Sequence, residues 1–120
     1  MTQLPEQAID RVANYFQALA EPTRLRILNL LRETEHNVGE LAEASGFTAA
    51  NMSRHLSVLM QQGFVKREGR GTSVYYQIAD PTIYTLCDLV CDRISQQHSE
   101  QAWPVSSNAK KRPTTTRKPA

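Results

Sequence analysis

Residues 37–63, NVGELAEASGFTAANMSRHLSVLMQQG, decide the fold of this chain. The stretch opens with Asn37 and Glu40, which have the spacing of a capping box, with the asparagine as N-cap and the glutamate reaching back to it. Gly46 ends the helix that they begin about two turns later, because glycine readily adopts the left-handed conformation that stops a helix. A short first helix followed by a tight turn is therefore predicted.

The helix that follows this turn has two unlike faces. Thr48 is its expected N-cap, and the helix runs through Gln62 to a stop at Gly63. Arg54 lies about 160° around the helix from Met52, at 100° per residue. The apolar residues that share one side are Met52, Leu56 and Leu59. Two helices joined by a short turn that contains glycine predict a helix-turn-helix.

Two further helices precede this pair. Residues 6–19 carry apolar side chains at helical spacing: Ile9, Val12, Ala13, Phe16 and Leu19. Glu21-Pro22-Thr23 opens a second helix, with Pro22 in an early position where its missing N–H costs nothing. Apolar residues occupy most of the circumference of this second helix, so we expect it to be buried: Leu25, Ile27, Leu28, Leu30 and Leu31.

After Gly63 the pattern changes to that of a β-hairpin with a basic tip. Residues 65–68 and 73–78 are β-type runs on either side of Gly69-Arg70-Gly71-Thr72. Asp80 then caps a last helix over about residues 81–97. The predicted fold is mainly α with a small β-hairpin wing, in the order ααααββα, which is a winged helix-turn-helix.

A winged helix-turn-helix binds double-stranded DNA through the second helix of the pair and through the wing. Asn51 and Arg54 have side chains suited to adenine and guanine edges. Hydroxyl and imidazole groups suit phosphates, and basic residues of the wing can reach the flanking backbone or the minor groove. The expected DNA-binding residues are Thr48, Asn51, Ser53, Arg54 and His55 on the helix, and Lys66, Arg67 and Arg70 on the wing.

The uneven distribution of charge supports this interpretation. After Trp103 there are five basic and no acidic residues, which leaves nine basic against twelve acidic residues in positions 1–103. Within that acidic body, residues 46–79 have a net charge of +3. A local positive region suggests a docking surface for phosphates.

We expect residues 1–5 to be a flexible N-terminus, 6–98 the DNA-binding domain and 99–120 a disordered basic tail, which acts either as an inert linker or as a nonspecific electrostatic arm. No apolar run approaches the roughly 20 residues that span a bilayer, and no signal peptide is evident, so no membrane partner is expected. With two cysteines and no export signal, the chain is expected to be cytoplasmic with reduced thiols.

Several separate motifs resemble the ArsR/SmtB family of winged-helix repressors. They are residues 16–31 (FQALAEPTRLRILNLL), 38–42 (VGELA), 52–59 (MSRHLSVL), 63–70 (GFVKREGR) and 74–78 (VYYQI). The resemblance implies a homodimer, paired through its first and last helices, that sits on operator DNA and leaves it when an inducer binds. The family usually has Gln and Ser where this chain has Ala49 and Ala50, so more of the base reading falls to Asn51 and Arg54.

The two metal sites that this resemblance implies are not matched by the residues present. One site uses cysteine pairs at the start of the helix-turn-helix, where this chain has residues 37–39 without a thiol. The other uses Asp and His residues on the last helix. Asp80 matches its first ligand, but Thr82, Arg93 and Gln96 stand where the others belong. Neither metal site is expected, and no cofactor is required.

The last helix instead carries both cysteines, Cys87 and Cys91, about 40° apart on one face. One interpretation makes them small buried residues of a dimer interface. The other makes them an inducer site for arsenite or another soft metal, or for an oxidant or reactive sulfur. Two thiolates are an incomplete site for most metals, so His98, Asp88 or the partner subunit would have to help.

Other classes of function are less consistent with the sequence. The chain has no glycine-rich phosphate loop, no HExxH motif and no nucleophile with an evident base, and its three histidines fall on three elements. An enzyme is therefore not expected. The remaining alternatives are a repressor whose cysteines are purely structural, and a winged-helix module that binds proteins rather than DNA.

Overall fold

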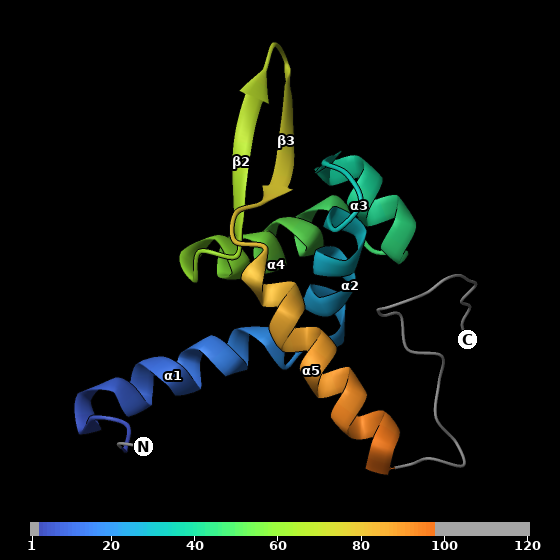
Figure 1. The fold of residues 1–120 in the computed structure, drawn as a ribbon. Coiled ribbons are helices and arrows are strands. Elements are labelled where there is room, and N and C mark those ends of the chain that lie inside the picture. The colour runs from blue at the N-terminus through green and yellow to red at the C-terminus, as the bar shows by residue number, and fades with distance from the viewer. Residues whose placement is uncertain (1–2, 98–120) are drawn as a thin grey trace. The chain divides into compact units, whose positions relative to one another are not determined.

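The computed structural model describes residues 3–97, which form two compact units, one up to Asp80 and one from Pro81 onward. The first unit contains four helices and three strands: α1 (Glu6–Leu19), α2 (Pro22–Leu31), β1 (His36–Asn37), α3 (Val38–Ser45), α4 (Ala49–Gln61), β2 (Val65–Arg70) and β3 (Ser73–Ile78). The second contains α5 (Thr82–Gln97). The predicted order of five helices and a hairpin is confirmed, and the fold is an α+β winged helix-turn-helix (Figure 1).

Local side-chain and backbone hydrogen bonds set the start of α3 and the turn after it. The Oδ1 atom of Asn37 accepts from the backbone N–H of Glu40 at 2.8 Å, and the Glu40 carboxylate accepts from that of Asn37 at 3.0 Å, so the predicted capping box is present. Gly46 ends the helix with φ of 73°. The N–H of Phe47 then donates to the carbonyl of Ala42, as in a Schellman motif.

The same kind of ending recurs after α4. Gly63 has φ of 81°, and the N–H of Phe64 donates to the carbonyl of Leu59 at 3.0 Å. Phe64 is buried, whereas Phe47 is 40% exposed. Both helices of the predicted pair therefore end at a Gly-Phe sequence, and strand β2 of the wing begins directly after the second of these sequences.

The core of the first unit lies between α2, α3, α4 and the base of the wing. The three apolar residues predicted on one side of α4 are all fully buried: Met52, Leu56 and Leu59. Fully or nearly buried partners come from the neighbouring elements: Ile27, Leu28, Leu31, Leu41, Ala42, Phe64, Val65 and Tyr76. Because one side of α4 is buried in the core, the opposite side of that helix is available for binding.

The expectation that α2 is buried over most of its circumference is wrong. Leu25 is 42% exposed and Arg26 is also exposed, while Ile27, Leu28 and Leu31 are buried on one face. The helix begins as predicted with Pro22 in its first turn. Its cap is Glu21, whose carboxylate accepts from the N–H of Thr23 at 2.7 Å and of Arg24 at 3.2 Å.

The sheet has three antiparallel strands in the order β1-β3-β2, of which β1 was not predicted. In the wing, Val65 lies opposite Ile78 and Arg70 opposite Ser73, so Gly71 and Thr72 form a two-residue connection. Gly71 has φ of 61°, as such hairpin turns require. The short strand β1 pairs His36 with Tyr76 and so joins the segment before α3 to the wing.

Several apolar residues of α1 and α5 are exposed in the single chain. On α1, Ile9 is 43% and Phe16 50% exposed, while Tyr15 packs against Phe64 with ring centroids 4.7 Å apart. On α5, Leu89 is 62% and Val90 48% exposed. Within residues 3–97, none of the helices has the length and apolar character that crossing a membrane requires.

Candidate nucleic-acid interface

The exposed side of α4 carries most of the residues that the sequence nominates for DNA binding. Thr48, Asn51, Ser53 and Arg54 are all exposed, and Arg54 lies opposite the buried side of the helix; we call these four residues the α4 polar face. Thr48 also caps the helix, because its Oγ1 atom accepts from the N–H of Asn51 at 3.2 Å. The cap therefore stabilises the first turn of α4, and the polar side chains there are exposed.

Arg54 and Asn51 are linked within this face. The Nη2 atom of Arg54 donates to Oδ1 of Asn51 at 3.3 Å, and both side chains are exposed. A single exposed hydrogen bond of this length contributes little, so it holds the two groups near each other without preventing either from binding elsewhere. The two side chains best suited to base edges are thus neighbours one turn apart.

His55 has a different environment from the α4 polar face. Its side chain is only 21% exposed, and its Nδ1 atom lies 3.2 Å from Nη1 of Arg24 and 3.9 Å from the carboxylate of Glu21. Arg24 also donates from Nε to the carbonyl of Ala18 at 2.6 Å, at the end of α1.

This cluster joins α1, α2 and α4, and sequence reasoning did not identify it. Partial burial acts to raise the pKa of Glu21, but the backbone N–H groups of Arg24 and Thr23 and the charges of His55 and Arg24 lower it below its ordinary value. Arg24 and His55 are 31 positions apart, and no local pattern signals their contact. We assign the cluster a role in connecting the helices.

The three basic residues nominated on the wing do not share a face. Side chains alternate along a strand, and cross-strand partners lie on the same side. Lys66 and Arg70 therefore point to the face of Tyr75 and Gln77, whereas Arg67, opposite Tyr76, points to the other. Lys66 and Arg67 are both exposed. The two faces cannot meet the same stretch of DNA backbone in the same way.

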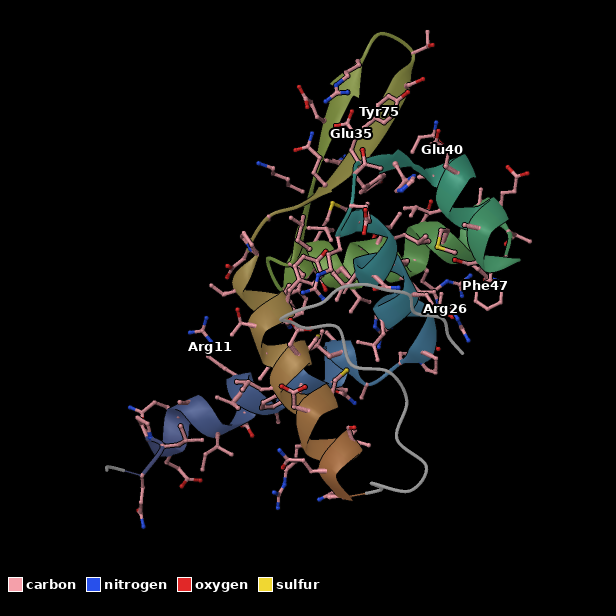
Figure 2. The ribbon with its side chains drawn as sticks, turned by 45° about the vertical axis from the view of Figure 1, so that its right-hand side comes forward. Arg11, Arg26, Glu35, Glu40, Phe47 and Tyr75 are labelled. Carbon is pink, nitrogen blue, oxygen red and sulfur yellow. The ribbon has the colours of Figure 1, made fainter. Side chains whose placement is uncertain are left out.

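Arg70 is engaged with acidic residues of its own chain. It forms a two-point ion pair with Glu35, in which Nη2 donates to Oε1 at 2.7 Å, and it contacts Glu68 at 2.9 Å. Hydrogen bonds to Glu35 and Glu68 raise the pKa of Arg70. The hydrogen bond from Arg70 lowers the pKa of Glu35 against the opposing effect of partial burial. Figure 2 shows Glu35, from the segment before β1, near Tyr75 of β3.

Both cysteines lie on α5, which belongs to the second unit. Cys87 and Cys91 carry thiols and are each partly exposed. His98, the auxiliary ligand expected from the sequence, lies outside the described residues, as does the basic tail. Over residues 3–97, no three His, Cys, Asp or Glu side chains come together in an arrangement that could hold a metal ion. A metal at the two thiols would need ligands from elsewhere.

Comparison with known proteins connects this arrangement to a family of regulators. The family described as "Bacterial regulatory protein, arsR family" matches residues 21–67. An "Uncharacterized HTH-type transcriptional regulator" of Mycobacterium tuberculosis is 41% identical over 75 residues, which are 62% of this chain and 66% of that protein. Its crystal structure aligns with a TM-score of 0.74 over 81% of this chain and 98% of that one, at 34% identity.

Two further relatives carry more specific descriptions. A protein of Streptomyces lividans named "Probable mercury resistance operon repressor" is 35% identical over 77 residues, 64% of this chain and 62% of that protein. A homodimeric winged helix-turn-helix DNA-binding domain from Mycobacterium bovis aligns with a TM-score of 0.68 at 33% identity, over 83% of this chain and 94% of that one. In sequence, the chain thus spans slightly less than two thirds of the curated relatives named here.

Proposed function

Since the chain belongs to the ArsR family of bacterial regulatory proteins, we propose that it is a sequence-specific DNA-binding transcriptional repressor and not an enzyme. The observation that carries the proposal is the two-sided α4. Its back is fully buried, and its exposed side presents Asn51 and Arg54 together. Such a repressor would act on chromosomal DNA, in the cytoplasm. A helix of this kind, ending at a wing, suits insertion into a major groove.

We further propose that the repressor is a homodimer paired through α1 and α5. Apolar side chains on both helices are exposed in the single chain, including Phe16 at 50% and Leu89 at 62%. Large exposed apolar residues on both helices indicate a surface that another chain covers. The M. bovis relative is described as homodimeric, which supports a homodimer here. Two α4 helices would then contact two half-sites about one DNA turn apart.

The inducer, in this proposal, is a thiophilic species that reacts at Cys87 and Cys91. The two thiols are both partly exposed and lie one turn apart on a helix of the proposed dimer interface. Their Cβ atoms, at i and i+4, are about 5–6 Å apart by helix geometry, which is too far for an unstrained disulfide. A larger soft atom can bridge them, and the S. lividans relative is named for mercury resistance.

Selection of binding sites from a pool of random duplexes tests the repressor proposal. The purified full chain should enrich a two-fold symmetric sequence, and the complex should weaken steeply as salt is raised, because phosphate contacts release counterions. Failure to enrich any sequence would refute a role in reading DNA. It would favour the second candidate, a winged-helix module for protein partners.

A separate experiment tests the inducer. Arsenite, Hg²⁺ and hydrogen peroxide are titrated into the complex of the chain with its selected duplex, for the wild type and for Cys87→Ser/Cys91→Ser. The double variant should bind the duplex as the wild type does, yet remain bound when the reagents are added. If it is released at the same concentrations as the wild type, the cysteines are structural and the inducer acts elsewhere.

A further inference from the structure

Arg70, although it lies at the end of β2 next to the tip of the wing, reaches back along the sheet toward the base of the wing. Its guanidinium lies over the ring of Tyr75, with the central carbon 5.0 Å from the ring centroid. From there it forms the two-point ion pair with Glu35, the residue just before β1, and also contacts Glu68. Its charge is therefore directed at its own chain.

Gln77 completes the contacts between these residues. Its Nε2 atom donates to Oε1 of Glu35 at 2.9 Å and to Oε1 of Glu68 at 3.0 Å. The register explains why they meet: His36 lies opposite Tyr76, so Glu35 comes beside Gln77. Glu35, Glu68, Arg70 and Gln77 form what we call the wing-base network, which joins the segment before α3 to both strands of the wing.

The charge of this network does not suit a phosphate. Two carboxylates and one guanidinium give a net charge of −1, and two of the carboxylate oxygens already accept from two donors each. An Arg70 that turned to DNA would leave Glu35 and Glu68 close together without their shared cation, and near the phosphates as well. The arrangement favours retention of the ion pair when DNA is bound.

The outer part of the wing needs such an anchor, because the core holds the base of the wing through the buried residues Val65 and Tyr76. A two-stranded hairpin is marginally stable by itself, and β1 contributes only His36 and Asn37 to the third strand. The segment before α3 leads directly into the helix-turn-helix, so a tie between this segment and β2 fixes the wing relative to α4. That relation decides whether the wing and α4 meet DNA together.

We propose that Arg70 is a positioning residue, anchored on Glu35, that orients the wing and does not itself contact DNA phosphates. This inference rests on the proposed function. It assigns Arg70 a different role from the DNA contact expected from the sequence, and it gives Glu35, which the sequence did not single out, a place in DNA binding.

The first test needs no DNA. Amide hydrogen exchange is measured for the wild type, Glu35→Gln, Arg70→Gln and the double variant, with Glu33→Gln as the control, because Glu33 is an exposed carboxylate two residues from Glu35. Amide exchange should become faster in both single variants at four residues: His36, Asn37, Tyr75 and Tyr76. The double variant should exchange at the same rate as the single variants. Unchanged exchange in both single variants would overturn the inference.

The second test measures affinity for the selected duplex over a range of salt concentrations. Glu35→Gln and Arg70→Gln should each weaken binding by up to about fivefold, since partly exposed ion pairs contribute modestly. The slope of log K against log salt should stay at the wild-type value in both. Their effects should not add in the double variant, and Glu33→Gln should not weaken binding.

Two results would show a different role for Arg70. If it binds phosphate, Arg70→Gln makes the slope shallower by about 0.9 for each phosphate that is no longer neutralised, while Glu35→Gln behaves as Glu33→Gln does. If Glu35 holds Arg70 back from DNA, Glu35→Gln tightens binding and steepens the slope. Either result overturns the inference. Absence of any sequence preference in the wild type would instead refute the proposed function, and the exchange experiment would still decide whether the wing is anchored.

Discussion

Replacement of Arg54 by lysine separates base reading from simple charge attraction on the α4 polar face. A guanidinium can donate two parallel hydrogen bonds to O6 and N7 of guanine, whereas an ammonium group is a point charge without that fork. Arg54 is exposed, and its 3.3 Å hydrogen bond to Asn51 contributes little, so this side chain loses little free energy when it turns to a base. Arg54→Lys retains the charge and removes the geometry.

The expected magnitude follows from one such contact in each protomer. A bidentate arginine–guanine pair contributes about 1–3 kcal/mol of discrimination, which is roughly 5- to 150-fold in affinity ratio. In the proposed dimer, two independent half-sites double this to about 2–6 kcal/mol. Arg54→Lys should lose that preference for the selected duplex over a scrambled one, while its salt dependence stays close to that of the wild type.

Fluorescence anisotropy with labelled selected and scrambled duplexes, at several salt concentrations, measures both quantities. Arg11→Lys is the matched control, because Arg11 is an exposed arginine on α1 and the same change is made there (Figure 2). The control should match the wild type. If Arg54→Lys retains the full preference for the selected duplex, Arg54 contacts phosphate rather than a base. The bidentate contact with guanine would then be refuted.

Three further predictions concern stability and are measured by urea unfolding. Leu56→Ala should lower the free energy of unfolding by about 2–5 kcal/mol, because Leu56 is fully buried. The control Ser57→Ala, on the exposed side of α4, should change it by less than about 0.5 kcal/mol. A small loss for Leu56→Ala would mean that the core closes around the cavity. Asn37→Ala should cost about 1 kcal/mol through loss of the capping box, and Asn29→Ala on the exposed side of α2 should cost less. The pKa of Glu35 is lowered in the folded chain, so its contribution is present above the ordinary value of 4.5 and is lost as pH falls through the lowered pKa. Glu35→Gln should therefore flatten the decline of stability in acid, and an unchanged decline would contradict the ion pair with Arg70.

The helix boundaries could be predicted from the sequence because their signals are local. The capping box at Asn37, the cap at Thr48 and the stop at Gly63 each depend on residues within one turn of one another. The two-residue strand β1 had no such signal, since it is too short for any periodicity and exists only through its pairing with β3. The exposure of Leu25 on α2 likewise depends on which face its neighbours cover.

The candidate interface could be predicted from the sequence where it depends on helix or strand periodicity, and not where it depends on contacts between distant residues. The two sides of α4 follow from helical spacing alone, and the opposite directions of Lys66 and Arg67 follow from strand alternation. The partners of Arg70 and His55 could not be predicted, because Glu35 and Arg24 are 35 and 31 positions away from them. Composition identifies basic residues, but only the fold determines which of them are neutralised by acidic residues of the same chain.

The positions of Ala49 and Ala50 make the specificity of this chain easy to alter without altering its fold. Both are exposed in the first turn of α4, between the Thr48 cap and the polar residues that follow. Glutamine and serine are close enough to alanine in helix propensity that exchange there costs only a few tenths of a kcal/mol each. New base-reading groups can therefore be introduced at these two positions, by engineering or by evolution, so that a retargeted regulator keeps the stability and the wing of the original.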